Sequence, residues 1–99
     1  MHYHNDEMGL KEIVLNDFRA YLDTHRKQDD HWKTGASEFS PDRWKEGSKL
    51  RKEQDVFIYR LVPRKELALA LVDHLEEEFG LEKEVVEGRD GYYWVYAYA

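Results

Sequence analysis

The sequence contains no cysteine among its 99 residues, and this absence excludes several kinds of site. Without thiols the chain can form no disulfide framework, no thiolate nucleophile and no zinc ribbon. The lack of cysteine fits a reducing compartment, so we expect a cytoplasmic protein. No apolar run approaches the roughly 20 residues that a membrane-spanning helix needs, and we therefore predict no membrane partner. The polar stretch from Met1 to Glu7 does not resemble a secretory signal.

Motifs that carry catalysis are also missing. No serine lies in a GxSxG elbow, and neither GxxxxGK[ST] nor GxGxxG occurs. Carboxylates are plentiful, but nothing in their spacing selects a catalytic pair. We therefore predict a protein that is not an enzyme and needs no cofactor, and keep a metal-dependent enzyme as a third hypothesis. That hypothesis would use His25, Asp29, Asp30 and His31, although a helix C-terminus explains His25 equally well.

The formal net charge of −6 is distributed unevenly along the chain. Residues 32–52 carry six basic and three acidic groups, whereas residues 64–99 carry four basic and nine acidic groups. An acidic balance argues against a general polyanion binder, which needs a positive footprint. It leaves room for a local basic patch in the middle of the chain.

Hydrophobic periodicity predicts two long helices. Residues from about 9 to 27 carry an apolar stripe at helical spacing, and residues 64–79 carry a second stripe that ends at Gly80, a natural C-cap. Ser40-Pro41-Asp42 is a good helix start and predicts a short helix near residues 41–46.

Three segments are typical of strands. Residues 56–62 are β-branched and aromatic with apolar groups on both faces, which predicts a central strand. A second strand is expected around Val85-Val86, and residues 92–98 form the third. Asp90-Gly91 predicts a hairpin turn between these last two strands.

The pattern as a whole predicts one small α+β domain over residues 1–99. We expect a two-layer fold in which two main helices and a short third helix pack on a three-stranded sheet. The expected order is α-α-β-α-β-β, ending in a β-hairpin. Residues 1–8 are expected to be flexible, and residues 28–54 to form a long irregular or short-helix connection.

The last strand is rich in aromatic residues, and its two faces differ. We expect Tyr93, Val95 and Ala97 to lie under the helices together with Val86. The other face, at least partly open, would bind a partner through tyrosine and tryptophan, which are common at interfaces. It comprises Tyr92, Trp94, Tyr96 and Tyr98. The alternative is that this face is core, covered by residues 28–54.

Two charged sets are further candidates, and for each the alternative is a solvated surface. The first is acidic and would dock on a basic partner protein. Its residues are Asp73, Glu76, Glu77, Glu78, Glu84 and Glu87. The second is basic and aromatic and would bind nucleic acid through phosphate contacts and base stacking. Its residues are Trp32, Arg43, Trp44, Lys45, Lys49, Arg51 and Lys52.

These observations favour a small acidic protein-interaction module, in its sharper form an inhibitor or regulator that occludes a basic nucleic-acid-handling partner protein. The expected partner is therefore a protein, and a homodimer through the aromatic strand is one form of this hypothesis. The alternative is a nucleic-acid-binding protein that uses the basic and aromatic segment 32–52.

Overall fold

The computed structural model describes residues 3–27, 31–39 and 57–99, with side chains of the first segment from Met8 onward. These residues form two helices and four strands, consistent with the predicted α+β class. The elements are α1 (Tyr3–His25), β1 (Lys33–Ser37), β2 (Phe57–Val62), α3 (Lys65–Phe79), β3 (Glu82–Lys83) and β4 (Tyr93–Tyr98). The short helix expected at 41–46 lies outside the described residues.

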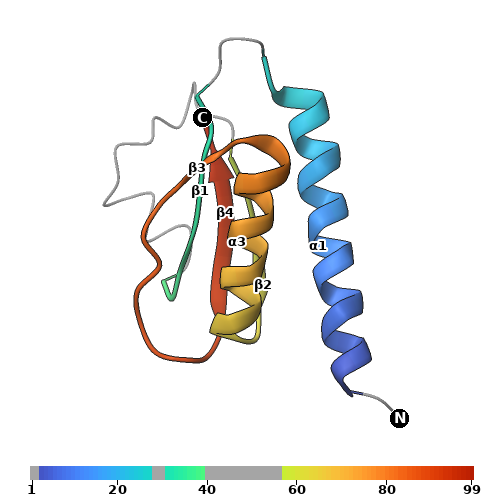
Figure 1. Ribbon diagram of the computed structural model, residues 1–99, viewed down its shortest axis with the longest axis vertical. Helices are drawn as coiled ribbons and strands as arrows, with labels where there is room; N and C mark the ends of the chain where they lie inside the picture. Colours follow the sequence, from blue (N-terminus) through green and yellow to red (C-terminus); the bar gives the residue numbers. More distant parts are fainter. Residues whose placement is uncertain (1–2, 28–30, 40–56) are drawn as a thin grey trace.

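Both helices pack on one face of the sheet and run in the same direction (Figure 1). α3 follows the prediction closely: its buried stripe is Leu67, Ala68, Leu71, Val72 and Leu75. It ends at Gly80, whose left-handed backbone (φ 69°) lets its N–H bond to the carbonyl of Glu76.

The buried stripe of α1 is rotated slightly from the one that its sequence suggests. Val14, Phe18 and Leu22 are buried as expected, and Leu15 is buried with them at 1% exposure. Ile13, whose spacing also fits an apolar stripe with Val14 and Phe18, is instead 60% exposed. The side chains of Phe18 and Leu22 face the core. Ile13 projects from the helix in a different direction, so its side chain faces water.

The sheet has four strands in the order β2-β4-β1-β3, which corrects the predicted three-stranded sheet. β4 is antiparallel to both β1 and β2, and β3 is parallel to β1. The expected terminal hairpin is therefore wrong, because the strand before β4 pairs with β1 instead. β2, which we expected to be central, lies at an edge of the described sheet.

β1 falls in the segment that we expected to be irregular. Its sequence, Lys-Thr-Gly-Ala-Ser, has low strand propensity, yet its three middle residues are buried. Thr34 is fully buried, and its hydroxyl donates to the carbonyl of Tyr96 at 2.8 Å. Pairing with β4 on one side and β3 on the other, rather than local preference, therefore makes this segment a strand.

α1 lies along the outer side of β2, where it closes part of the sheet edge (Figure 1). The backbone N–H of Phe57 donates to the hydroxyl of Tyr21 at 3.1 Å. The Arg60 guanidinium bonds Asp17 at 3.0 Å and the Tyr59 carbonyl at 2.7 Å. These contacts satisfy edge groups that could otherwise template the addition of another strand.

The residues between β3 and β4 pass the N-terminus of α3 and do not form a hairpin turn. Asp90 accepts the backbone N–H of Lys65 at 3.1 Å, which places a carboxylate at the positive end of the helix. The Lys65 ammonium donates to the Gly88 carbonyl at 2.6 Å, and the Tyr93 hydroxyl donates to the Arg89 carbonyl at 2.7 Å. Asp90 thus caps a helix, where its sequence context had suggested a turn.

In the described ranges, neither helix has an apolar window long enough to cross a bilayer.

The buried Gly35 provides a first test of this architecture. A Cβ at position 35 would lie 2.5 Å from the Tyr96 hydroxyl oxygen, so Gly35→Ala must displace a buried ring. We expect a loss of about 1–3 kcal/mol in the free energy of unfolding, measured by urea denaturation.

Gly9→Ala is the matched control. Gly9 lies on the exposed side of α1 with nothing within 4 Å of an added Cβ. Alanine should therefore stabilise the helix by about 0.5–1 kcal/mol. Equal effects from the two substitutions would contradict the placement of Tyr96 over Gly35.

Candidate functional site

The two faces of β4 have different surroundings, as its alternation predicts. Tyr93, Val95 and Ala97 are all fully buried under the helices. Val86 packs against the same core although it lies in a loop and not in a strand. The expected division of β4 into a core face and a second face is therefore present in the structure.

The second face of β4 joins that of β2 to form a continuous apolar surface, which we call the aromatic face. It comprises Phe57, Tyr59, Leu61, Trp94, Tyr96 and Tyr98. Strand register places Tyr59 opposite Tyr96 and Leu61 opposite Trp94. The rings contact one another at tilted or edge-on angles: Tyr59 and Trp94 have centroids 5.7 Å apart, and Tyr96 and Tyr98 are 6.0 Å apart.

Exposure varies across the aromatic face. Tyr96 is only 6% exposed, whereas Tyr59 is 37% and Leu61 43% exposed, and Trp94 is half-buried. The open part thus lies on β2 and the adjoining end of β4. Tyr92, which we had grouped with this face, precedes the strand and is 65% exposed.

A carboxylate lies at the other end of the aromatic face. The hydroxyl groups of Tyr96 and Tyr98 donate to the two oxygens of Glu84 at 2.7 and 2.9 Å. Burial, and then the hydrogen bond to Glu84, raise the pKa of Tyr96, so its hydroxyl keeps its proton and remains a donor. Gly35 provides the room for this arrangement.

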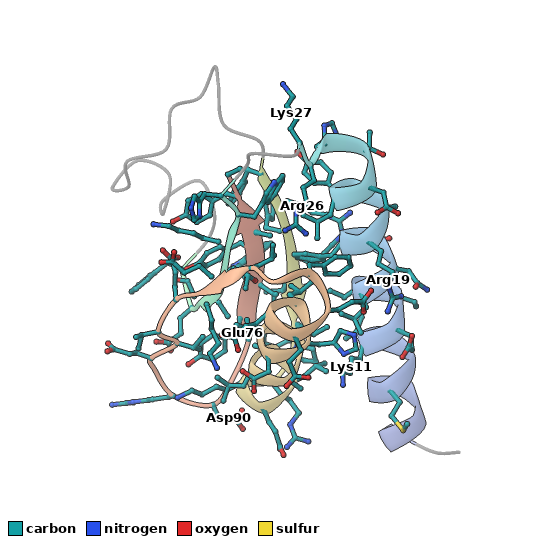
Figure 2. The ribbon with its side chains drawn as sticks, turned by 45° about the horizontal axis from the view of Figure 1, so that its top comes forward. Lys11, Arg19, Arg26, Lys27, Glu76 and Asp90 are labelled. Atoms are coloured by element: carbon teal, nitrogen blue, oxygen red, sulfur yellow. The ribbon has the colours of Figure 1, made fainter. Side chains whose placement is uncertain are left out.

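The predicted acidic surface is largely occupied by internal contacts. Asp73 and Glu76 lie 2.8 and 3.7 Å from the Lys83 ammonium. Glu78 pairs with Arg19, and Glu84 with the two tyrosines. Of the six predicted residues, Glu77 and Glu87 are exposed and make no ion pair within the described ranges. Figure 2 shows Glu76 on α3. It also shows that Asp90 lies at the end of the molecule opposite to Arg26 and Lys27.

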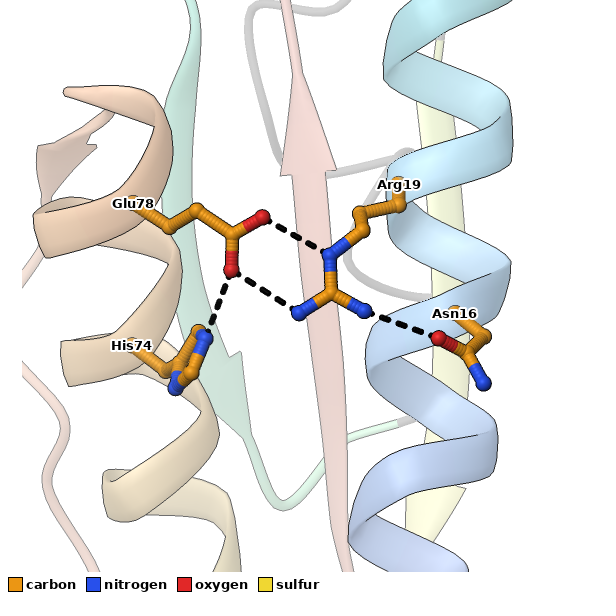
Figure 3. A network of polar contacts seen from close by, with 4 residues as sticks. All are labelled: Asn16, Arg19, His74 and Glu78. Atoms are coloured by element: carbon orange, nitrogen blue, oxygen red, sulfur yellow. Dashed lines mark hydrogen bonds and ion pairs between the residues drawn. The ribbon is translucent and has the colours of Figure 1, made fainter.

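Glu78 forms the centre of a network that connects the two helices (Figure 3). Arg19 donates through Nε and Nη2 at 2.7 and 2.9 Å, and the ring of His74 lies 2.7 Å away. The side-chain oxygen of Asn16 accepts a hydrogen bond from Nη1 of Arg19 at 2.8 Å. The hydrogen bond from Arg19, followed by that with His74, lowers the pKa of Glu78 to about 2. This network holds α1 against α3 and has the geometry of a structural ion pair.

The predicted nucleic-acid set is not assembled by the described residues. Trp32 is 2% exposed and belongs to the core, so it is not available to stack on a base. Among the described residues its indole N–H has no hydrogen-bond partner, and its ring lies edge-on to Tyr21 at 6.3 Å. The other members, Arg43, Trp44, Lys45, Lys49, Arg51 and Lys52, lie outside the described residues.

The histidines form no metal site in the part of the chain that the structure describes, where no three ligating side chains converge. His25 stacks on Tyr21 with ring centroids 4.2 Å apart, and Asp29 and Asp30 lie outside the described residues.

No family model, no curated protein and no solved structure matches this chain. The aromatic face, with Glu84 at one end, is therefore the candidate site that geometry alone supports.

The Glu78 network predicts a specific pH dependence of stability. The folded-state pKa of Glu78 lies below its ordinary value of 4.5, so its contribution is present above pH 4.5 and is lost as the pH falls toward 2. We expect Glu78→Gln to lower the melting temperature by a few °C at pH 6. The difference from wild type should vanish near pH 2. Glu77→Gln, which removes an exposed carboxylate with no described ion pair, should change little at either pH, and a pH-independent loss in Glu78→Gln would contradict the ion-pair interpretation.

Proposed function

We propose that this protein is a small acidic protein-interaction module without catalytic activity, and that it docks a partner protein through the open part of its aromatic face. The observation that carries the proposal is the exposure of Tyr59 and Leu61 on the side of the sheet that neither helix covers. Apolar surface of this kind, next to a half-buried tryptophan, is typical of interaction sites.

Three properties support a protein partner over other partners. The aromatic face carries no charged side chain of its own, so it offers no direct contact to phosphates. Its rings pack against one another at tilted and edge-on angles, which gives a broad amphipathic surface. Tyrosine and tryptophan also bind with little loss of side-chain entropy.

The finer proposal is that the partner is a basic, nucleic-acid-handling protein whose surface is occluded. The net charge of −6 and the exposed Glu77 and Glu87 support it, because opposite charge speeds encounter. The internal pairing of Asp73, Glu76 and Glu78 reduces the charge that this surface can offer. The aromatic face therefore supplies most of the contact area in our proposal, and the acidic residues supply steering.

Leu61→Asp tests the docking surface. Leu61 is 43% exposed on an edge strand, so the fold should tolerate the change while the apolar contact is lost. We expect proteins captured by the wild type from the source cells to be lost, and a partner affinity measured by calorimetry to fall at least about tenfold. If the partner is a second copy, light scattering should show a dimer that becomes a monomer.

Val85→Asp is the matched control, since Val85 is 80% exposed and lies in the loop between β3 and β4. It introduces the same charge at an apolar surface residue away from the docking surface. A partner that both variants retain, or that both lose, would contradict the proposed site.

A further inference from the structure

Glu84 differs from Asp73, Glu76 and Glu78, the other members of the predicted acidic surface that have side-chain partners. Asp73, Glu76 and Glu78 are neutralised by Lys83 or Arg19. Glu84 has no ion-pair partner in the described ranges, and its carboxylate accepts only the hydroxyls of Tyr96 and Tyr98. Lys33, the basic residue of β1, makes no ion pair with it. A half-buried carboxylate is thus held beside aromatic rings without a cation.

The position of this carboxylate is fixed from both sides. The backbone N–H of Glu84 donates to the Thr34 carbonyl at 2.8 Å, which ties residue 84 to β1 directly after β3. The Cβ of Glu84 lies 3.3 Å from where a Cβ of Gly35 would be, so it sits over the glycine and next to the Tyr96 ring. Each carboxylate oxygen receives one tyrosine hydroxyl, which orients the group before any ligand arrives.

We infer that Glu84, with Tyr96 and Tyr98, forms a recognition site for an arginine side chain of the docked partner. This inference rests on the proposed function, since the arginine belongs to the protein that docks on the aromatic face. An ionised carboxylate has about four lone-pair sites, of which the tyrosines occupy one on each oxygen. The remaining capacity of each oxygen can accept one of the paired N–H groups of a guanidinium.

Charge complementarity favours arginine over other ligands. The chain carries a net charge of −6, and a guanidinium offers two parallel N–H donors to the two oxygens of one carboxylate. Lysine would supply the charge but not the planar pair of donors. A metal ion would need further ligating groups, and no three such groups converge in the described residues.

A labelled octapeptide of alternating arginine and glycine tests the site by fluorescence anisotropy in about 150 mM salt, where long-range attraction is screened. Matched peptides carry lysine or the neutral isostere citrulline in place of arginine. We expect the wild type to bind the arginine peptide most tightly. Glu84→Gln should weaken this binding about tenfold, which corresponds to about 1.4 kcal/mol. Glu12→Gln, the same charge change on the exposed side of α1, should weaken it less than about twofold.

Glu84→Asp separates geometry from charge, and it also guards against poor folding of the glutamine variant. It keeps the charge but shortens the side chain by one methylene, so the carboxylate no longer reaches both tyrosines and binding should fall several-fold. Equal losses from Glu84→Gln and Glu12→Gln, unchanged binding by Glu84→Asp, or equal binding of the arginine and citrulline peptides would each overturn the inference. Failure of the wild type to bind the arginine peptide would overturn it too. The proposed function fails separately, when Leu61→Asp and Val85→Asp behave alike toward the captured partner.

Discussion

The pairing of β4 with both β1 and β2 is the constraint on which the rest of the structure depends. It joins two strands that do not pair with each other, and it sets the register of each. Because side chains alternate along a strand, this register sends Tyr93, Val95 and Ala97 toward the helices and Trp94, Tyr96 and Tyr98 to the opposite side. A shift of one residue would exchange the core for the aromatic face. The fully buried Thr34 reinforces the register, since its hydroxyl reaches the Tyr96 carbonyl.

The helices and the division of β4 could be predicted from the sequence because each rests on a periodic apolar pattern. The stripe of α3 and the Gly80 cap are local signals, and the structure contains both. The strand β1 could not be predicted in this way. Thr34, Gly35 and Ala36 have little strand preference, and they are buried only because β4 and β3 flank them. The predicted hairpin was wrong for a related reason. Asp90-Gly91 has the composition of a turn, but the carboxylate of Asp90 accepts a backbone N–H at the N-terminus of α3.

The candidate site was predictable only in part. Composition and alternation identified the aromatic residues of β4 and allowed Phe57, Tyr59 or Leu61 of β2 to extend the face. They did not show that Tyr59 and Leu61 would be its most exposed residues. Glu84 was visible in the sequence only as one member of an acidic cluster. Its particular role depends on Tyr98 and Tyr96, which are 14 and 12 residues away, and on the missing side chain at Gly35. Such combinations arise from tertiary packing, and no local motif encodes them.

The central position of β4 also has a consequence for the order in which the molecule can assemble. β4 follows every other described element along the chain, and the bond between Thr34 and Tyr96 spans 62 residues. Closing so long a loop costs entropy before any sheet is gained, and folds dominated by such pairings are slow to form. During synthesis β1, β2 and α3 leave the ribosome first, with unpaired strand edges and an uncovered apolar helix face. We therefore expect the nascent chain to expose the most unpaired strand edge and apolar surface just before residues 93–98 emerge.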